Sequence, residues 1–449
     1  PYTAKDFYSM VAFFADLDES QHFTDGSNSL PTKRFPEITV LARWQRQVVA
    51  SLDRKITALA DRASLTAAEA DDLATWTAER KRMESAQRRT MISKTTPPRE
   101  IRILPRGNWL DDSGPVVMPT TPEFLPAASD SDRRRTRLDL ANWLTDPDKG
   151  VGGFTARVFV NRFWYLLFGR GISSSLADFG GQGEPPTHPE LLDQLAIDFM
   201  QSGWDVKWMI RRLVLSRTYQ QSSTATKAEL KNDPYNRFFA RQSRYRLSAE
   251  MVRDNALSVS GLLVHEVGGA SVKPYQPAGY YRHLNFPQRK YKPDSGANQW
   301  RRGVYTHWQR QFLHPMLKAL DAPSREECTA QRSRSNTPLE ALVLLNDPTM
   351  LKAASVLAGR LLNMPSDDDQ TRLSAAFTLA TTRKADATEL ASLAKLLDAE
   401  RVYYRENVAA ADQLLGGTMP TPDLDPVELA AWTAVSRAIL NLYETVTRN

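Results

Sequence analysis

The feature that most constrains this chain is a series of helix-start signals in its second half. A threonine or aspartate is followed three residues later by a glutamate in the segments 187–190, 337–340 and 386–389. Such a pair forms a capping box, which satisfies the free backbone amides of the first helical turn. Apolar residues then recur every three or four positions. The pattern predicts a mainly α protein: a multi-helix globular core with a long helical hairpin and minor irregular β segments.

The same periodicity locates the individual elements. It predicts an N-terminal helix over 3–16 and an antiparallel helical hairpin over 37–92, in which Thr66 and Glu69 form a further capping box. Short β segments are expected near 100–104, 116–118 and 301–307. The remaining helices are expected at 133–145, 154–168, 188–202, 206–217, 248–263, 337–346, 348–363, 369–381, 387–405 and 427–446.

Proline divides the chain into regions. Seven prolines fall between residues 95 and 131, and proline neither continues a helix nor donates a backbone hydrogen bond. We therefore expect a first region over 1–94 that carries the hairpin arm, a proline-rich crossover over 95–131, and a helical C-terminal domain over 132–449. Since the first residue is Pro1 rather than methionine, we also expect the chain to be a piece of a longer protein.

Composition excludes several classes of protein. The single cysteine, Cys328, rules out an internal disulfide framework or a multi-thiolate metal site. The six histidines lack the i, i+4 spacing of helical metal ligands, so we predict no metal site. No apolar run reaches the roughly 18 residues of a membrane span, so no transmembrane segment is expected. Arginine outnumbers lysine 42 to 16, but with no reader motif or continuous basic stripe we expect no nucleic-acid partner.

Aromatic and basic side chains alternate between residues 275 and 314. Tyrosine, tryptophan and histidine rings have apolar faces and polar tips, and neighbouring arginines can hold an anionic group. A cleft for a sugar or an acidic glycan can be built from these residue types. The alternatives are an interior layer of aromatic fillers and a subunit interface. We predict as substrate-binding residues from this stretch Tyr275, His283, Arg302, His307 and Trp308.

The next segment, 321–338, places acids, bases and a thiol just before a capped helix. Its candidate acid–base groups are Asp321 and Glu326, and its candidate substrate-binding residues are Arg325, Arg332 and Asn336. Ion pairing between the acids and the arginines is the alternative use of these groups. A helix start can also lower the pKa of a nearby thiol, although a lone cysteine is more commonly a small buried hydrophobe, which is what we expect of the cysteine here.

A second pair of candidate acid–base residues lies on the helix expected over 248–263. Glu250 and Asp254 are four residues apart and share one helix face. Two like charges there repel each other unless an arginine lies between them. The alternatives are therefore an acid–base pair and a structural arginine–carboxylate network.

Long motifs resemble a known family. The sequence is similar to planctomycete-type proteins that join a cytochrome-c-like module to paired domains of unknown function, and the similarity extends over nearly the whole chain. Residues 1–16 resemble the end of the first of these domains. The motifs that carry the resemblance include RLDLANWLTDP (137–147), ARVFVNRFWYLLFGRGI (156–172), DFGGQGEPPTHPELLDQLAIDF (178–199), GGASVKPYQPAGYY (268–281) and LDAPSREECTAQRSRSNTPLEALVLLNDP (320–348).

The resemblance implies an extracytoplasmic protein, in the periplasm or at the cell surface, associated with a c-type cytochrome. Any haem c is then held by an upstream segment or a partner chain, and this chain alone binds no cofactor. Two functions are compatible with these expectations. One is a redox-linked enzyme module that acts on carbohydrate or another anionic or polar substrate, with a glycan as its ligand. The other is a non-catalytic scaffold that holds the cytochrome module, or the N-terminal fragment of the same protein, and surface partners.

Overall fold

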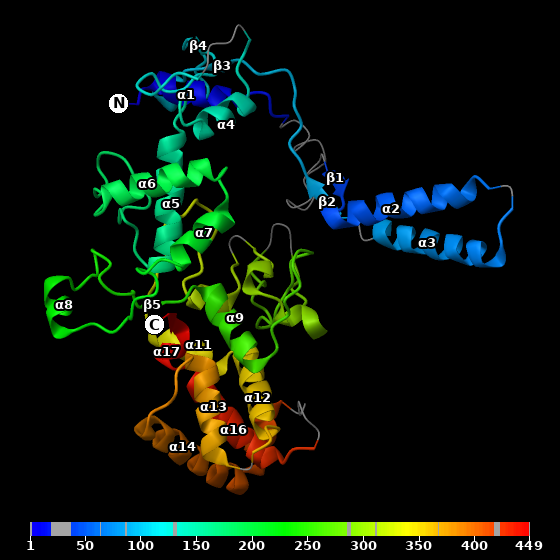
Figure 1. Cartoon of the computed structure of the whole chain (residues 1–449), viewed down its shortest axis with the longest axis vertical. Coiled ribbons are helices and arrows are strands. Elements are labelled where there is room, and N and C mark those ends of the chain that lie inside the picture. The colour runs from blue at the N-terminus through cyan, green and yellow to red at the C-terminus, as the bar shows by residue number, and fades with distance from the viewer. Residues whose placement is uncertain are drawn as a thin grey trace. The chain divides into compact units, whose positions relative to one another are not determined.

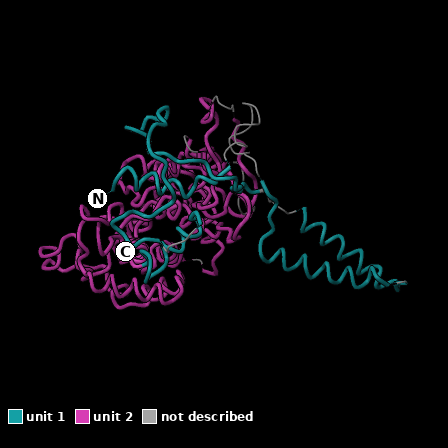
Figure 2. The backbone as a smooth tube through the Cα atoms, turned by 90° about the horizontal axis from the view of Figure 1, so that it is seen from above, with its two compact units in different colours: residues 1–152 teal, residues 153–449 magenta. Residues whose placement is uncertain are grey.

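The computed structural model has a mainly helical fold, which confirms the predicted fold class. Its described parts contain seventeen α-helices and six short strands, and the strands form three two-stranded antiparallel sheets. The chain divides into two compact units, residues 1–152 and 153–449 (Figure 2). The structure describes residues 2–18, 37–62, 64–85, 88–128, 133–284, 289–309, 312–366, 368–416 and 423–448.

The first unit contains a small helical core. Helix α1 (Ala4–Ala12) begins with a capping box between Thr3 and Asp6, and α4 (Arg137–Thr145) follows the proline-rich segment. Strands β3 (Ile101–Arg102) and β4 (Val116–Val117) pair within that segment, near both expected β positions. The helix expected over 3–16 ends at residue 12, and residues 13–16 form turns. The buried core of this unit consists of Phe13, Ala128, Leu140, Trp143 and Val151.

The first unit also contains the predicted hairpin, whose helices α2 and α3 pack against each other (Figure 1). Leu52 and Leu59 are buried on α2, while α3 has no buried residue. The capping box between Thr66 and Glu69 is present. The two ends of the arm form a β ribbon that we did not expect, because each strand is only four residues long and the second, Arg-Arg-Thr-Met, shows no apolar alternation. The bounds are β1 Glu37–Val40, α2 Arg43–Ala60, α3 Ala67–Ser85 and β2 Arg88–Met91.

The second unit has two hydrophobic clusters. The first is aromatic and joins α5 (Gly152–Phe168), α6 (Pro189–Gln201) and α7 (Val206–Val214). Its centre is the stacked pair Trp164 and Phe168, whose ring centroids are 4.1 Å apart. The cluster anchors the C-terminal end of α5. Its buried members are Ala156, Val160, Trp164, Phe168, Ile172, Leu192, Leu195, Ala196, Phe199, Met209, Leu213 and Phe239.

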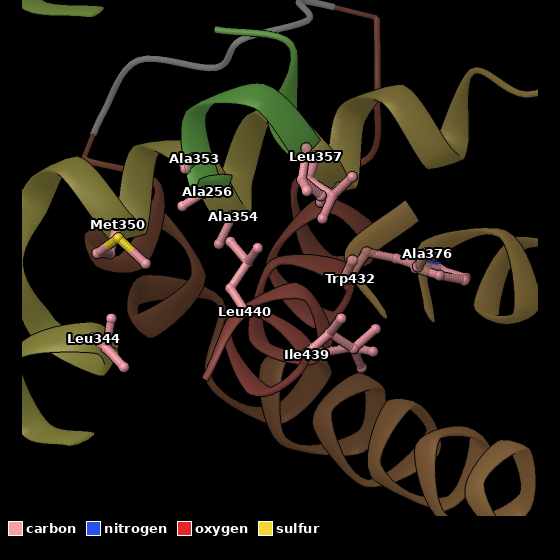
Figure 3. Close-up of a cluster of buried hydrophobic side chains, with 14 of the residues drawn as sticks. Ala256, Leu344, Met350, Ala353, Ala354, Leu357, Ala376, Trp432, Ile439 and Leu440 are labelled. Atoms are coloured by element: carbon pink, nitrogen blue, oxygen red, sulfur yellow. The ribbon is translucent and has the colours of Figure 1, made fainter. Parts of the chain in front are cut away.

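The second cluster is larger and is formed by long helices packed around α12 and α16 (Figure 3). Alanines at 353 and 354 let the helices approach closely, and Trp432 fills the space between them. Helix α9 packs against α12. The bounds are α9 Ala249–Ser260, α10 Pro315–Ala319, α11 Pro338–Asn346, α12 Pro348–Leu362, α13 Asp369–Thr381, α14 Ala387–Glu406, α15 Val408–Leu415, α16 Pro426–Leu440 and α17 Tyr443–Val446.

Short elements connect these clusters. Strand β5 (Tyr245–Arg246) pairs with β6 (Thr447–Arg448), which brings the last described residues next to the start of α9. The single helix expected over 427–446 is therefore two helices, since the chain turns after residue 440 to form β6. Where a strand was expected over 301–307, the backbone forms two isolated bridges and a 3₁₀ turn. The remaining bounds are α8 Lys227–Asn232, η2 Pro105–Gly107, η3 Gly296–Trp300 and η4 Gly303–Tyr305.

The helix starts agree with the predicted caps in two of three cases. Asp386 and Glu389 form a complete capping box, and Thr337 caps α11. Thr187 does not cap α6, because its hydroxyl donates to the Ile172 carbonyl and the helix begins after His188.

Among the described residues, no single helix is long and apolar enough to cross a bilayer. Helices α11 and α12 reach the length and hydropathy of a membrane span only when they are taken together, and a 56° bend separates them.

Candidate functional site

A cavity of about 810 Å³ opens in the second unit where six segments meet. These segments are the C-terminal half of α5, the turn at Tyr219, β5 with the start of α9, the 3₁₀ turn η4, the loop over 320–334, and β6. We call it the arginine–tyrosine pocket, after the side chains that dominate its lining: Tyr165, Tyr219, Tyr245, Arg325, Arg334 and Arg448.

The C-terminal end of α5 positions the tyrosines. Tyr165 is one turn from the end of the helix, which Gly169 terminates with a left-handed φ of 75°. A side chain at Gly169 would collide with the ring of Tyr245. Tyr245 is fixed further by its hydroxyl, which donates to the Leu166 carbonyl at 2.9 Å. The missing side chain at 169 therefore lets strand β5 lie directly on the helix end.

Guanidinium groups lie over the tyrosine rings. The Arg334 guanidinium is 4.5 Å from the ring centroid of Tyr245 and 5.1 Å from that of Tyr165. Arg448 lies 4.5 Å from the Tyr219 ring and donates to the Tyr245 hydroxyl at 2.9 Å. Cation–π contacts of this kind hold an arginine in place without neutralising it. The charges of Arg334 and Arg448 therefore remain available to a ligand.

A third arginine is held in the same way at the other side of the pocket. The Arg325 guanidinium lies 3.7 Å from the Trp308 ring, and the Trp308 indole donates to the Ser324 carbonyl at 3.0 Å. Partial burial lowers the pKa of Arg325, and the neighbouring Arg332 charge lowers it further, while Glu250 opposes the shift. This guanidinium therefore lies in an environment that disfavours positive charge.

Two of the predicted catalytic carboxylates line the pocket. Glu250, at the start of α9, accepts a hydrogen bond from Arg332 Nη1 at 2.7 Å. Asp321 accepts from Arg246 Nη2 at 2.5 Å and from the Ser335 amide at 2.6 Å. Burial opposes the ionisation of Asp321, but the Ser335 and Arg246 donors outweigh it and lower its pKa. Asp321 is therefore an ionised structural anchor.

Asp254 and Glu326, the other two predicted catalytic carboxylates, are not part of the pocket lining. Asp254 accepts from the Gly303 amide at 2.7 Å, and burial raises its pKa. Glu326 is exposed, and its backbone amide donates to the Ser324 hydroxyl. The i, i+4 pair of Glu250 and Asp254 is thus divided between two environments, because Asp254 turns toward the 3₁₀ turn η4.

The predicted substrate-binding residues are divided in the same way. Arg325 and Arg332 line the pocket, and Trp308 supports Arg325. Cys328 is exposed, contrary to our expectation that it is buried. It lies in the loop segment 324–329, in which every residue is exposed to solvent. Besides Trp308, five predicted residues lie outside the pocket lining: Tyr275, His283, Arg302, His307 and Asn336.

Those five residues have local roles or are exposed. The Tyr275 carbonyl contacts His314 Nε2 at 2.7 Å, and Arg302 lies beside the Tyr305 ring. Burial lowers the pKa of His307, and nearby Lys273 lowers it further. His283 and Asn336 are exposed. Among its described residues, the aromatic stretch 275–314 includes contacts between rings, such as the edge-on packing of Tyr281 and Phe312.

The pocket carries an excess of positive charge. Six arginines and two carboxylates line it, which leaves a formal charge of +4. Arg332 and Arg246 bind carboxylates. Within the described part of the chain, the other four arginines have no carboxylate partner: Arg162, Arg325, Arg334 and Arg448. Apolar side chains, including the exposed Leu166, Met251 and Val304, complete the lining.

Sequence reasoning missed the tyrosine side of this pocket. Tyr165 lies inside an apolar helix and looks like a core residue, and Tyr245 and Arg448 meet only through the pairing of β5 with β6. No local sequence pattern predicts a contact between strands that are about 200 residues apart. One local pattern could have pointed to this side of the pocket: Arg162 and Tyr165 are three residues apart and so lie on one face of α5.

Comparison with known proteins gives one match. The model of a family described as PSD1, protein of unknown function (DUF1553), matches residues 136–397, which is more than half of the chain. This segment contains every pocket-lining residue named above except Arg448. No curated protein and no solved structure matches the sequence.

Among the described residues, no cluster of three or more histidine, cysteine, aspartate or glutamate side chains has the arrangement of a metal site.

Proposed function

Since the chain belongs to the PSD1 family of proteins of unknown function, we propose from its geometry that it binds an anionic carbohydrate in the arginine–tyrosine pocket. The observation that carries the proposal is the group of arginines, Arg325, Arg334 and Arg448, that surround a cavity of about 810 Å³ without carboxylate partners among the described residues.

The electrostatics of the empty pocket support an anionic ligand. Like charges around a partly desolvated cavity repel each other, and a carboxylate or sulfate group placed among them relieves that repulsion. The planar guanidinium fork matches both groups and can donate two parallel hydrogen bonds. Because the tyrosine and tryptophan rings hold Arg334, Arg448 and Arg325 in position, little side-chain entropy is lost when the ligand binds.

The uncharged part of the lining supports a sugar as the carrier of the anion. The lining exposes Leu166, Met251 and Val304, and such apolar groups can cover the C–H face of a pyranose ring. Ser333 and Thr329 supply hydroxyl groups that can bind sugar hydroxyls. A pocket with mostly apolar walls and a few convergent polar groups is typical of ligand sites.

We propose Glu250 as the group that would act on a bound ligand. Asp321 is committed to Arg246 and Ser335, whereas Glu250 is held by Arg332, whose side chain is 41% exposed. An incoming anion competes with Glu250 for Arg332 and would release the carboxylate toward the ligand. This arrangement supports the proposed acid–base role of Glu250.

The wider role that we propose is extracytoplasmic and linked to a c-type cytochrome. Its support is the resemblance of the long motifs, such as those at 178–199 and 320–348, to cytochrome-associated proteins. Purification from the native source followed by an absorption spectrum tests it. We expect a Soret band that elutes with this chain, and a colourless preparation would contradict the association.

The alternative function is a scaffold, and the hairpin arm is the observation that favours it. Helix α3 has no buried residue, and Trp44 at the start of α2 is 58% exposed. A long arm with uncovered faces is suited to contacts with partner proteins. A scaffold needs no ligand in the arginine–tyrosine pocket, so a binding experiment separates the two functions.

The test is isothermal titration with digalacturonate and with a sulfated disaccharide, and with lactose as the neutral control. We expect an acidic disaccharide to bind, with an affinity that falls as salt is raised. Arg334→Ala should weaken binding by tenfold or more, since a charged hydrogen bond contributes about 1.5–3 kcal/mol. Arg405→Ala, which removes a 66% exposed arginine elsewhere in the second unit, should leave the affinity unchanged.

Two results would contradict the proposal. One is equal binding of lactose and the acidic disaccharides. The other is an affinity that Arg334→Ala does not change. If neither acidic disaccharide binds at all, the scaffold function is favoured instead.

A further inference from the structure

The arginine–tyrosine pocket does not end at its tyrosines. An adjoining hollow of about 400 Å³ shares Tyr165, Arg332 and Arg334 with it. A third hollow of about 290 Å³ shares Tyr165 and Tyr245 with the pocket, and shares Tyr165, Gly169 and Gln331 with the second hollow. The three hollows therefore adjoin one another at Tyr165, and we call them together the groove of the second unit.

The third hollow repeats the chemistry of the main pocket. Its lining contains Arg244, which is exposed and donates only to the Ser223 hydroxyl at 3.3 Å, with no carboxylate partner among the described residues. It also contains Tyr235, whose exposed fraction of 77% leaves the ring free. Ser243 and Gln331 add polar groups that can bind hydroxyls. A free guanidinium thus lies near an uncovered ring, beside small polar groups.

From this adjacency, and on the basis of the proposed function, we infer that the ligand is an extended acidic oligosaccharide. One anionic unit lies in the arginine–tyrosine pocket, and a further unit occupies the hollow formed by Tyr235 and Arg244. The repeat of a ring, a guanidinium and hydroxyl groups matches a polymer whose units each carry a sugar face and an anionic group. Units that are joined covalently gain affinity from the second subsite at little additional entropic cost.

The lining favours a saccharide over a single-stranded nucleic acid, which is the other flexible polyanion. Single strands are bound by successive aromatic platforms on which the bases stack. In the groove, Tyr165, Tyr219 and Tyr245 already carry a guanidinium on one face. Tyr235 has no such partner among the described residues. One free ring with serine and glutamine neighbours suits sugar units better than a stack of bases.

The test compares ligand lengths. Titrations use galacturonate oligomers of two, four and six units, with chondroitin sulfate oligomers as a parallel sulfated series. We expect the hexamer of at least one series to bind tenfold or more tightly than its dimer. Tyr235→Ala and Arg244→Ala should return the hexamer affinity to that of the dimer and leave the dimer affinity unchanged. Both side chains are exposed, so unchanged melting temperatures confirm that the variants fold.

The outcomes separate this inference from the proposed function. If dimers bind and Arg334→Ala weakens them, but length has no effect, the extended groove is wrong and the pocket remains a ligand site. An unchanged hexamer affinity in both groove variants also overturns the inference. If a uridine hexanucleotide binds more tightly than the acidic hexamers and loses affinity in the same variants, the groove is a nucleic-acid site. If no acidic saccharide of any length binds, the proposed function fails together with the inference.

Discussion

At the scale of single residues, the pocket contains arginines in two different states. Arg246 is 8% exposed and lies between Asp321 and Glu340, so its charge is neutralised inside the protein. Arg334 lies over two tyrosine rings and is not neutralised among the described residues. Buried arginines paired with carboxylates maintain the fold, whereas ring-stacked arginines that reach a cavity are free to bind ligand. Under the proposed function, the same residue type thus serves structure and recognition within one pocket.

Asp321→Asn tests the structural state. Asparagine tolerates the left-handed φ of 61° at this position but cannot neutralise Arg246. At pH 7 we expect the free energy of unfolding to fall by about 1.5–3 kcal/mol, the contribution of hydrogen bonds to charged groups. Urea denaturation followed by tryptophan fluorescence measures this. The exposed Asp398→Asn variant is the control and should change stability by less than about 0.5 kcal/mol.

The effect of Asp321→Asn depends on pH. The pKa of Asp321 is lower in the folded protein than in the unfolded chain, where it is about 3.9. The unfolded state therefore binds more protons in this range, and the contribution of the carboxylate is fully present above about pH 4. It is lost as the pH falls through the folded-state pKa. The stability difference between wild type and Asp321→Asn should shrink below pH 4, and a difference that is constant with pH would contradict the account.

The sequence identified one side of the pocket at this scale. Glu250, Arg325, Arg332 and Asp321 stand out because acids and bases are concentrated in two short segments, and the structure brings these residues to one cavity. The sequence did not identify Arg448, because no pattern near that residue predicts its contact with Tyr245. A contact between distant segments depends on how the intervening helices pack, and single-sequence patterns do not contain that information.

At the scale of elements, the pocket depends on how α5 ends. Gly169 adopts the left-handed conformation that terminates the helix, and its amide donates to the Tyr165 carbonyl at 2.8 Å. Strand β5 then lies against this turn, and its pairing with β6 places Arg448 over Tyr219. The geometry of one helix end therefore sets the positions of the Tyr165 and Tyr245 rings and of the Arg448 guanidinium.

Gly169→Ala tests this dependence. The added methyl group strains the left-handed backbone and collides with the Tyr245 ring, so we expect a loss of about 1–3 kcal/mol in stability and weaker binding of the acidic disaccharide. Gly153→Ala, in the first turn of the same helix, is the matched control, since its added methyl group meets nothing within 4 Å. Thermal denaturation and titration of both variants measure the effect. Equal behaviour of the two variants would contradict it.

Helix starts show how far elements can be predicted. The capping boxes at 66–69 and 386–389 form as expected, because each needs only residues of its own turn. The signal at 187–190 fails, because Thr187 donates to the Ile172 carbonyl from a different segment. A cap can thus be predicted when no distant backbone group competes for its side chain. The β5–β6 pair was missed because strands of two residues carry no periodic pattern.

At the scale of the whole molecule, the two compact units differ in what they offer. The first contains the hairpin arm and a small core. The second contains both large hydrophobic clusters and the groove. The PSD1 match begins at Thr136, the N-cap of α4 in the first unit, and extends to residue 397 in the second. Our proposal therefore places ligand recognition in the second unit, and the alternative scaffold function would use the arm as a surface for partner proteins.

The most direct test of the central claim is a crystal structure of the protein with a bound galacturonate or chondroitin sulfate oligomer. The account predicts an anionic group of the sugar within hydrogen-bond distance of Arg334 and of Arg325 or Arg448. Density for the oligomer at any other surface, with the arginine–tyrosine pocket free of sugar, would contradict it.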